Sequence, residues 1–238
     1  MLILLPPSEG KAAEGNGPAV GELSFPALDR ARRRVVSALV KASRRRDALD
    51  VLGLSPGQAP ELAKNLALKT APTLPAAQLY TGVLYDNLGL ATLSPEALSR
   101  AEESVLIFSG LWGVLRITDR IPPYRLSMGV TLPPLGGLAA FWRPFVAKEL
   151  DRLPGLVVDL RSSTYAAAWK PGDRAVAVRV LRDGKVVSHM AKATRGEVAR
   201  ALLDSAAEPA TPDELAKVLQ DLGYAVRPAP GRIDVSVG

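Results

Sequence analysis

Ten side chains of this chain carry the cationic, hydroxyl and phenol groups that hold anions in proteins. Arginine grips a phosphate through two parallel hydrogen bonds, and lysine supplies a compact positive charge. A site built from such groups binds DNA, a nucleotide or another anion. The ten candidates are Ser8, Lys11, Tyr80, Arg116, Tyr124, Arg125, Ser163, Tyr165, Lys192 and Arg195.

The segment from Ile107 to Gly129 holds three of these candidates around one stiff turn. An apolar run ending at Phe108 predicts a buried strand before it. Gly110 and Gly113 follow, where the backbone can turn tightly or approach a phosphate. Arg116, Tyr124 and Arg125 then surround the pair Pro122-Pro123. A rigid loop that presents arginines predicts an anion-binding surface.

Several motifs along the chain share one resemblance. The central ones are S-G-L-W-G-V-L-R and P-Y-R-L-x-M-G, within residues 109–129. The others are L-I-L-L-P-P-S-E-G-K at residues 2–11, L-Y-T-G at 79–82, V-V-D-L-R-S-S-T-Y at 157–165, A-K-A-T-R-G at 191–196 and L-G-Y at 222–224. With these motifs the chain resembles the YaaA family of bacterial peroxide-stress proteins over nearly its whole length.

This resemblance implies a fold and a role. The fold is the compact one called cantaloupe. The role is protection against hydrogen peroxide, by limiting intracellular free iron and the associated DNA damage. The resemblance also implies a positively charged cleft that takes DNA and a helix-hairpin-helix-like element. The turn Gly110-Leu111-Trp112-Gly113 has the pattern of such a hairpin, offering backbone N–H groups to phosphate.

The composition limits the possible partners and chemistry. The chain has 238 residues, with 30 Lys and Arg against 24 Asp and Glu, and its formal net charge is +6. An excess of positive charge favours acidic partners such as nucleic acid or nucleotides. The chain has no cysteine. Disulfides, thiolate metal sites and thiol peroxidase chemistry are therefore excluded.

No motif predicts a metal or a cofactor. The single histidine, His189, is expected in a strand from Lys185 to Met190 as a structural residue. The sequence has no Walker A loop, no G-x-G-x-x-G and no G-x-S-x-G. We therefore expect neither a bound metal nor a cofactor.

Membrane insertion is not expected either. The apolar start from Met1 to Leu5 is too short for a signal peptide and ends at Pro6-Pro7. No run of 18 apolar residues is present. These features predict a cytoplasmic protein with no membrane partner.

The elements that must position the candidates alternate between strands and helices. Buried strands are predicted at 1–5, 105–108 and 156–160, and polar turns with Ser8, Lys11, Ser163 and Tyr165 leave two of them. Ligand sites of α/β proteins gather at such strand ends. Helices are predicted at 27–46, 76–88, from 94, 137–153, 194–205 and from 211; a hairpin is predicted at 175–181 and 185–190 about Asp183-Gly184, and a last strand at 233–237.

These elements predict an α/β or α+β fold, with a mixed β-sheet surrounded by helices, in one compact domain over residues 1–238. The predicted helix at 27–46 also carries eight basic residues, which form either a phosphate-contacting face or simply a solvated one. They are Arg30, Arg32, Arg33, Arg34, Lys41, Arg44, Arg45 and Arg46.

Three functions remain open on the sequence. The first is a peroxide-stress protein that binds DNA by its phosphates and structure and not by its base sequence, because Asn and Gln are scarce near the arginines. The second is an enzyme that acts on a nucleotide or small phosphorylated substrate. Its arginines would clamp the anion while Lys11 or Tyr165 served as acid, base or nucleophile. The third is a scaffold whose basic helix binds a protein partner.

Overall fold

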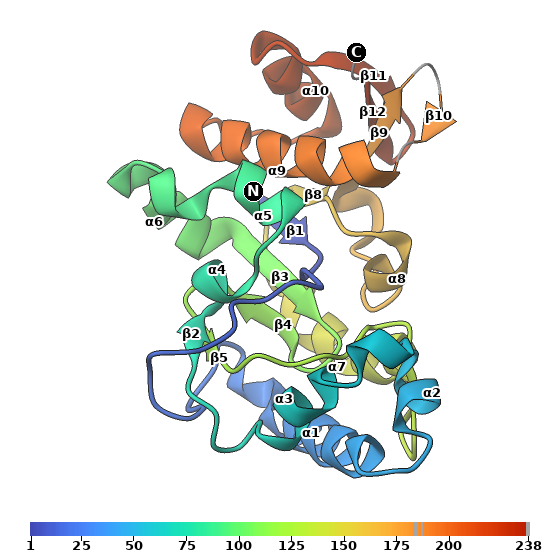
Figure 1. Ribbon diagram of the computed structural model, residues 1–238. Coiled ribbons are helices and arrows are strands. Elements are labelled where there is room, and N and C mark those ends of the chain that lie inside the picture. Colours follow the sequence, from blue (N-terminus) through green and yellow to red (C-terminus); the bar gives the residue numbers. More distant parts are fainter. Residues whose placement is uncertain (183–184, 187, 237–238) are drawn as a thin grey trace.

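One mixed sheet organises the computed structural model, which describes residues 1–182, 185–186 and 188–236 (Figure 1). Its strands lie in the order β11-β12-β9-β8-β1-β3-β4, and β10 pairs with β9. They are β1 (Leu2–Leu5), β3 (Val105–Ser109), β4 (Gly113–Arg116), β8 (Val157–Asp159), β9 (Ala175–Arg182), β10 (Lys185–Val186), β11 (Ala225–Ala229) and β12 (Arg232–Ser236). The predicted mixed sheet in a single compact α/β domain is confirmed.

The strands β3, β1, β8, β9 and β12 run parallel to one another, whereas β4, β10 and β11 are antiparallel to their neighbours. Strand β1 is central, with Ile3 opposite Val105 of β3 on one side and Leu2 opposite Val157 of β8 on the other. A strand covered on both faces is nearly continuously apolar. This explains the unbroken Leu-Ile-Leu-Leu of β1.

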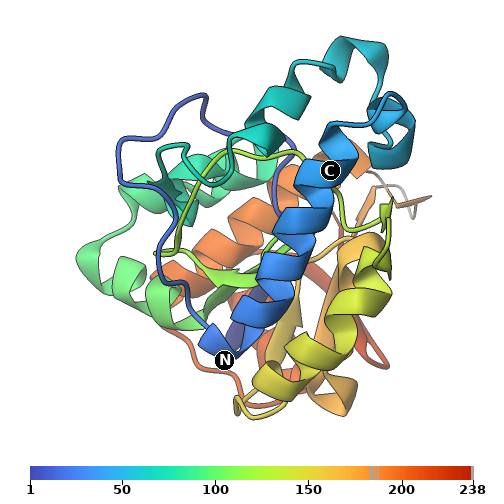
Figure 2. The ribbon, with the colours of Figure 1, turned by 90° about the horizontal axis from the view of Figure 1, so that it is seen from below.

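Helices cover both faces of the sheet. Helices α5 and α9 lie together on one side, and α1 and α7 lie side by side on the other (Figures 1 and 2). Arg34 of α1 packs its guanidinium over the ring of Phe141 of α7, 4.9 Å from the ring centre. The helices are α1 (Asp29–Ser43), α2 (Ala48–Leu52), α3 (Glu61–Leu66), α4 (Ala76–Leu79), α5 (Val83–Leu88), α6 (Pro95–Ser104), α7 (Leu138–Leu150), α8 (Ser163–Ala166), α9 (Ser188–Ser205) and α10 (Pro212–Asp221).

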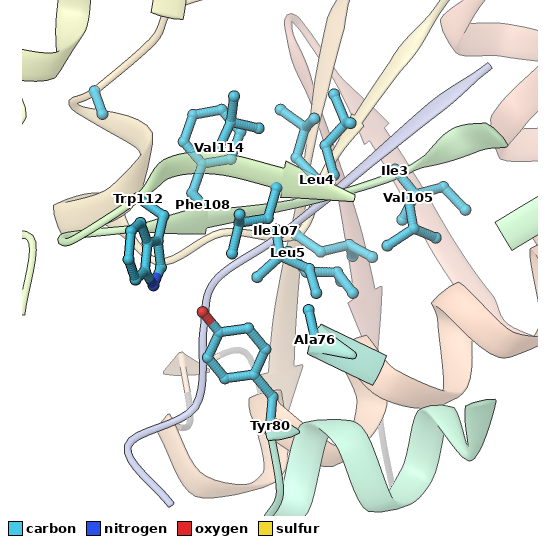
Figure 3. Close-up of a cluster of buried hydrophobic side chains, with 14 of the residues drawn as sticks. Ile3, Leu4, Leu5, Ala76, Tyr80, Val105, Ile107, Phe108, Trp112 and Val114 are labelled. Atoms are coloured by element: carbon cyan, nitrogen blue, oxygen red, sulfur yellow. The ribbon is translucent and has the colours of Figure 1, made fainter. Parts of the chain in front are cut away.

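The core lies between the sheet and these helices. Side chains of β1, β3 and β4 interlock there, and Tyr80 projects its hydroxyl into the same cluster (Figure 3). Small strand pairs complete the fold outside the main sheet, namely β2 (Leu74–Pro75) with β5 (Arg120–Ile121) and β6 (Thr131–Leu132) with β7 (Gly136–Gly137).

Several local predictions need correction. The predicted helix at 76–88 is two helices, α4 and α5. The chain becomes extended at Tyr80, with a ψ of 124°, and α5 starts after Gly82, which adopts a φ of 97°. The turn at Gly110–Gly113 joins two antiparallel strands, β3 and β4, so it is not the hairpin of a helix-hairpin-helix element. His189 belongs to α9, which starts at Ser188, and not to a strand.

Other predictions agree with the structure or fall outside it. The predicted N-caps at Ser94 and Thr211 are confirmed, since each side chain accepts the backbone N–H three residues ahead. The hairpin partners β9 and β10 pair as predicted, but β10 covers only Lys185–Val186 of the strand predicted at 185–190, and the helix predicted at 194–205 starts earlier, at Ser188. The turn residues Asp183-Gly184 and Val237 lie outside the described residues. Strand β11 had no alternating pattern to reveal it.

The order of the parallel strands creates a crevice at one edge of the sheet. From β1 the chain first forms β3 on one side and then crosses to β8 on the other. The connections that leave β1 and β8 therefore diverge. In open α/β sheets this switch point, at the carboxyl ends of the strands, is where ligands bind.

Among the described residues, no helix is both long enough and apolar enough to cross a membrane.

Candidate functional site

A cavity of about 410 Å³ opens at the switch point between β1 and β8. Its walls come from the loop after β1, the break between α4 and α5, the segment after β5, the start of α8 and the first turns of α9. Small-molecule sites commonly have volumes of roughly 300–1,000 Å³. The cavity therefore has the size and the position of a ligand site.

Six of the ten predicted site residues line this cavity, namely Ser8, Lys11, Arg125, Tyr165, Lys192 and Arg195. They come from four segments that are far apart in the sequence. Tyr80 and Tyr124 are buried directly behind Lys11 and form its support. Ser163 and Arg116 are the two that the structure does not bring to the cavity wall.

The loop that follows β1 is braced against the break between α4 and α5. Lys11 and Tyr80 form an isolated β-bridge, and the Ala12 N–H donates to the Leu79 carbonyl at 2.9 Å. The Ser8 hydroxyl donates to the Gly10 carbonyl and accepts the Thr81 N–H at 3.1 Å. Ser8 thus shapes the loop, and the loop fixes the base of the Lys11 side chain.

The Lys11 ammonium nitrogen sits against aromatic faces and not against a carboxylate. It donates to the Ser8 carbonyl at 2.9 Å, and it lies 4.4 Å from the ring centre of Tyr124 and 5.5 Å from that of Tyr80. The nearby carboxylates are engaged elsewhere. Glu61 pairs with Lys64 at 2.7 Å, and Glu9 pairs with Arg125 at 3.0 Å.

Burial lowers the pKa of Lys11 to about 7, and the positive charge of Arg125 acts in the same direction. The carboxylates of Glu61 and Glu9 and the faces of the two tyrosines oppose this shift, since they favour the charged form. The side chain therefore titrates near neutral pH. A substantial share of it is a free amine, which can act as a base or a nucleophile.

A chain of buried hydroxyl groups supports Lys11 from below. Ser109 Oγ accepts the backbone N–H groups of Leu111 and Trp112 at 3.2 and 3.0 Å. With both lone pairs used, its own hydrogen donates to the Tyr124 hydroxyl, 2.7 Å away, and Tyr124 in turn donates to Tyr80 at 2.9 Å. Burial raises the pKa of Tyr124 and Tyr80, so both stay protonated at neutral pH.

Arg125 reaches the cavity from a tightly held backbone. The side chain of Asn65, in α3, accepts the Arg125 N–H at 2.8 Å and donates to the Arg125 carbonyl at 2.9 Å. The guanidinium pairs with Glu9, whose own side chain is 79% exposed against 17% for Arg125. An arriving anion can replace this exposed carboxylate without moving the arginine.

Arg195 and Lys192 enter from α9 because that helix packs unusually close to α5. A Cβ on Gly196 would lie 2.2 Å from the Leu84 carbonyl oxygen, so only glycine permits this approach. Arg195 is half-buried, and its Nε has no hydrogen-bond partner among the described residues. Burial lowers the pKa of this guanidinium. Lys192 lies beside it and is exposed.

Arg116 performs a structural role away from the cavity. Its guanidinium donates to the carbonyls of Glu102 and Glu103 and lies over the ring of Phe25. These carbonyls end helix α6 and have no partner within it. The expectation that Arg116 and Arg125 act together is therefore corrected, because Arg116 lies at the end of α6 whereas Arg125 lines the cavity.

Ser163 is exposed at the start of α8, and its neighbours Ser162 and Thr164 line the cavity in its place. Thr81 and Ser127 add two more hydroxyl groups to the wall. Sequence reasoning passed over these four residues and Asn65. Thr81 lies within the motif L-Y-T-G, and Ser162 and Thr164 lie within R-S-S-T-Y, so the motifs could have identified these three residues. No local sequence pattern identified Asn65 or Ser127.

The helix predicted at 27–46 ends at Ser43, so Arg44, Arg45 and Arg46 lie in the turn after α1. The basic residues of α1 and this turn divide into one buried arginine and an exposed set. Arg32 is 3% exposed and donates to the carbonyls of Trp112, Val114 and Ser24 as well as to Asp29. It ties α1 to the β3–β4 turn. The other basic residues of this segment face solvent, and they are Arg30, Arg33, Arg34, Lys41, Arg44, Arg45 and Arg46.

No group of three or more His, Cys, Asp or Glu side chains is placed to hold a metal ion in the part of the chain that the structure describes. The side chains that line the cavity can bind an anion through cations and hydroxyl groups, and the amine of Lys11 lies among them.

Comparison with known proteins gives a consistent result. A family model described as "Peroxide stress protein YaaA" matches residues 1–229. A UPF0246 protein of Streptomyces coelicolor is 53% identical over 238 residues, covering 95% of this chain and 92% of that protein. A UPF0246 protein of Corynebacterium efficiens is 44% identical, covering 98% and 97%, and one of Corynebacterium glutamicum strain R is 43% identical, covering 97% and 96%.

Proposed function

This chain belongs to the YaaA family of peroxide stress proteins, and we propose that it acts in peroxide stress by binding DNA through the cations of the switch-point cavity. Bound in this way, the protein helps to limit iron-dependent oxidative damage to DNA. The chain has no cysteine, so a thiol of its own does not remove peroxide.

One observation carries this proposal. Three cationic side chains line the cavity beside the partly protonated Lys11, namely Arg125, Lys192 and Arg195, and among the described residues Glu9 is the one carboxylate that lines it with them. The carboxylate is exposed and can swing away. A cluster of this kind attracts phosphate, and held arginines lose little entropy when they bind it. Contacts to phosphate position a duplex without reading its sequence.

Fluorescence anisotropy with a labelled duplex at several salt concentrations tests the proposal. Affinity is expected to fall steeply as salt rises, because phosphate contacts release counterions. Duplexes of different sequence and equal length are expected to bind alike. Affinity that stays flat between low and moderate salt would overturn the proposal.

A second function is favoured by Lys11. A side chain that titrates near neutral pH inside a cavity at a switch point is typical of an enzyme. The candidate enzyme acts on a nucleotide or small phosphorylated substrate, with Arg125 and Arg195 on the phosphate and Lys11 or Tyr165 as acid, base or nucleophile.

A thermal-shift screen against nucleotides separates the two functions. A rise in melting temperature with one nucleotide, lost in Lys11→Ala and kept in Arg116→Ala, favours the enzyme. A shift with none of them, together with duplex binding, favours DNA binding alone.

A further inference from the structure

We propose that Lys11 forms a covalent imine with the aldehyde of a phosphate-bearing sugar held in the switch-point cavity. This inference rests on the proposed function for its anion site and names the ligand of that site. The shared chemistry is an aldehyde, hydroxyl groups and a phosphate on one small molecule or residue. A free sugar phosphate provides it, and so does an abasic deoxyribose within DNA.

The position of Lys11 is the first reason. The lysine is placed at the cavity wall by the β-bridge to Tyr80, and its nitrogen lies 2.9 Å from the Ser8 carbonyl. Within the described part of the chain no carboxylate forms an ion pair with it, since Glu9 and Glu61 pair with Arg125 and Lys64. An enclosed amine without a counter-ion loses its proton readily. Only the neutral amine attacks a carbonyl.

The surroundings of Lys11 supply the second reason. Arg195 carries a buried Nε that has no hydrogen-bond partner in the described part of the chain, and Arg125 and Lys192 flank the same space. These three cations fit a phosphate, whereas Lys11 lies deeper, over the tyrosine rings. Hydroxyls from Thr81, Ser127, Ser162 and Thr164 line the wall and fit the hydroxyl groups of a sugar.

The reaction balances without an oxidant or a reductant. The Lys11 nitrogen donates its lone pair to the aldehyde carbon, and the carbonyl oxygen gains a proton to form a carbinolamine. The nitrogen gives up its hydrogens, and the hydroxyl leaves as water. One amine and one aldehyde thus yield one imine and one water, and the reverse reaction releases the sugar.

Borohydride trapping tests the inference, because it reduces an imine to a stable secondary amine. The protein is mixed with 2-deoxyribose 5-phosphate in one arm and with a duplex containing one abasic site in the other. Borohydride is added near pH 7, and the adduct is located by peptide mass spectrometry. We expect a single adduct on Lys11, with inorganic phosphate competing in the free-sugar arm.

Variants make the result specific. Lys11→Arg keeps the charge but not the nucleophile, and we expect at least a tenfold loss of adduct. Lys69→Arg changes an exposed lysine outside the cavity by the same substitution, and we expect no loss. Thermal melts of both variants show whether they are folded, and Lys11→Met serves as a second variant if Lys11→Arg fails to fold.

The outcomes separate this inference from the proposed function. An adduct on Lys192 or spread over surface lysines, or none in either arm, overturns the inference whether or not the intact duplex binds. An adduct on Lys11 with the free sugar phosphate, together with no salt-dependent affinity for a duplex, upholds the inference and overturns DNA binding. An adduct on Lys11 in the abasic arm alone identifies DNA as the source.

Discussion

The cavity at the switch point and the exposed face of α1 are both rich in positive charge, but they hold it in different ways. In the cavity, Lys11 and Arg125 are fixed by bonds to distant segments, through the Tyr80 bridge and Asn65. On α1, Arg30 and Arg33 project into solvent, and so do Arg44, Arg45 and Arg46 in the turn that follows the helix. Among the described residues, Arg45 pairs with Asp47, two positions further along the chain. The comparison teaches that the number of charges on a segment does not locate a site. What matters is whether the side chain that carries each charge is already fixed in position before the ligand binds.

The largest expected effect concerns the one arginine of α1 that is buried. Arg32→Ala removes the donor for three carbonyls of the β3–β4 turn and the Ser24 loop. We expect a loss of about 3–5 kcal/mol in the free energy of unfolding, as for other broken buried ionic networks. Urea denaturation measures it. Arg33→Ala, next to it and exposed, should lie within about 0.5 kcal/mol of wild type.

The second prediction sets the cavity against α1 as a DNA-binding surface. Replacing Arg125 and Arg195 by Ala together should weaken duplex binding by roughly 2–4 kcal/mol, from charge-assisted bonds of about 1.5–3 kcal/mol each. Anisotropy measures the change. If a triple replacement of Arg44, Arg45 and Arg46 weakens binding more than this double replacement, then the basic turn after α1 is the site and the cavity is not.

The third prediction concerns pH. The pKa of Lys11 falls from 10.5 to about 7 on folding, through burial and Arg125, with smaller effects of Glu61, Lys64 and Glu9. Between these values the unfolded chain holds a proton that the folded one has lost. The unfolded state then binds more protons, so stability gains from Lys11 as pH rises from about 7 towards 10.

Lys11→Met lacks this gain. Urea denaturation of both proteins across that pH range should therefore show wild type improving relative to the variant as the pH rises. Parallel curves for the two proteins would mean that Lys11 keeps its ordinary pKa. The cavity would then hold Lys11 as a plain cation, like those of α1.

The smallest effect is expected from Arg116→Ala. Arg116 and Arg125 share one central segment, but Arg116 is engaged by the end of α6. Its loss removes the hydrogen bonds to the two carbonyls at the end of α6 and should lower the free energy of unfolding by about 1 kcal/mol. Duplex affinity should stay within error of wild type. A drop in affinity as large as that of Arg125→Ala would show that the DNA footprint extends beyond the cavity.

Much of the fold was determined by local sequence. Apolar runs predicted β1, β3 and β8, because strands covered on both faces are nearly continuously apolar. Ser94 with Pro95 and Thr211 with Pro212 predicted two helix starts, because capping depends on neighbouring residues alone. Polar turns after β1 and β8 pointed to the edge where the cavity lies.

The tertiary structure decided which of those polar residues meet. Arg116 and Arg125 look alike in sequence, and only the position of α6 separates them. No local sequence pattern identifies Asn65 as important. Its role is to hydrogen-bond the backbone of Arg125, which is distant in the sequence, and this contact exists only in the folded chain. Lys11 is an ordinary lysine in the sequence, and its altered pKa arises from burial and from a neighbour more than a hundred residues away. Local bonds are encoded by neighbouring residues, whereas burial and long-range charge exist only once the chain has folded.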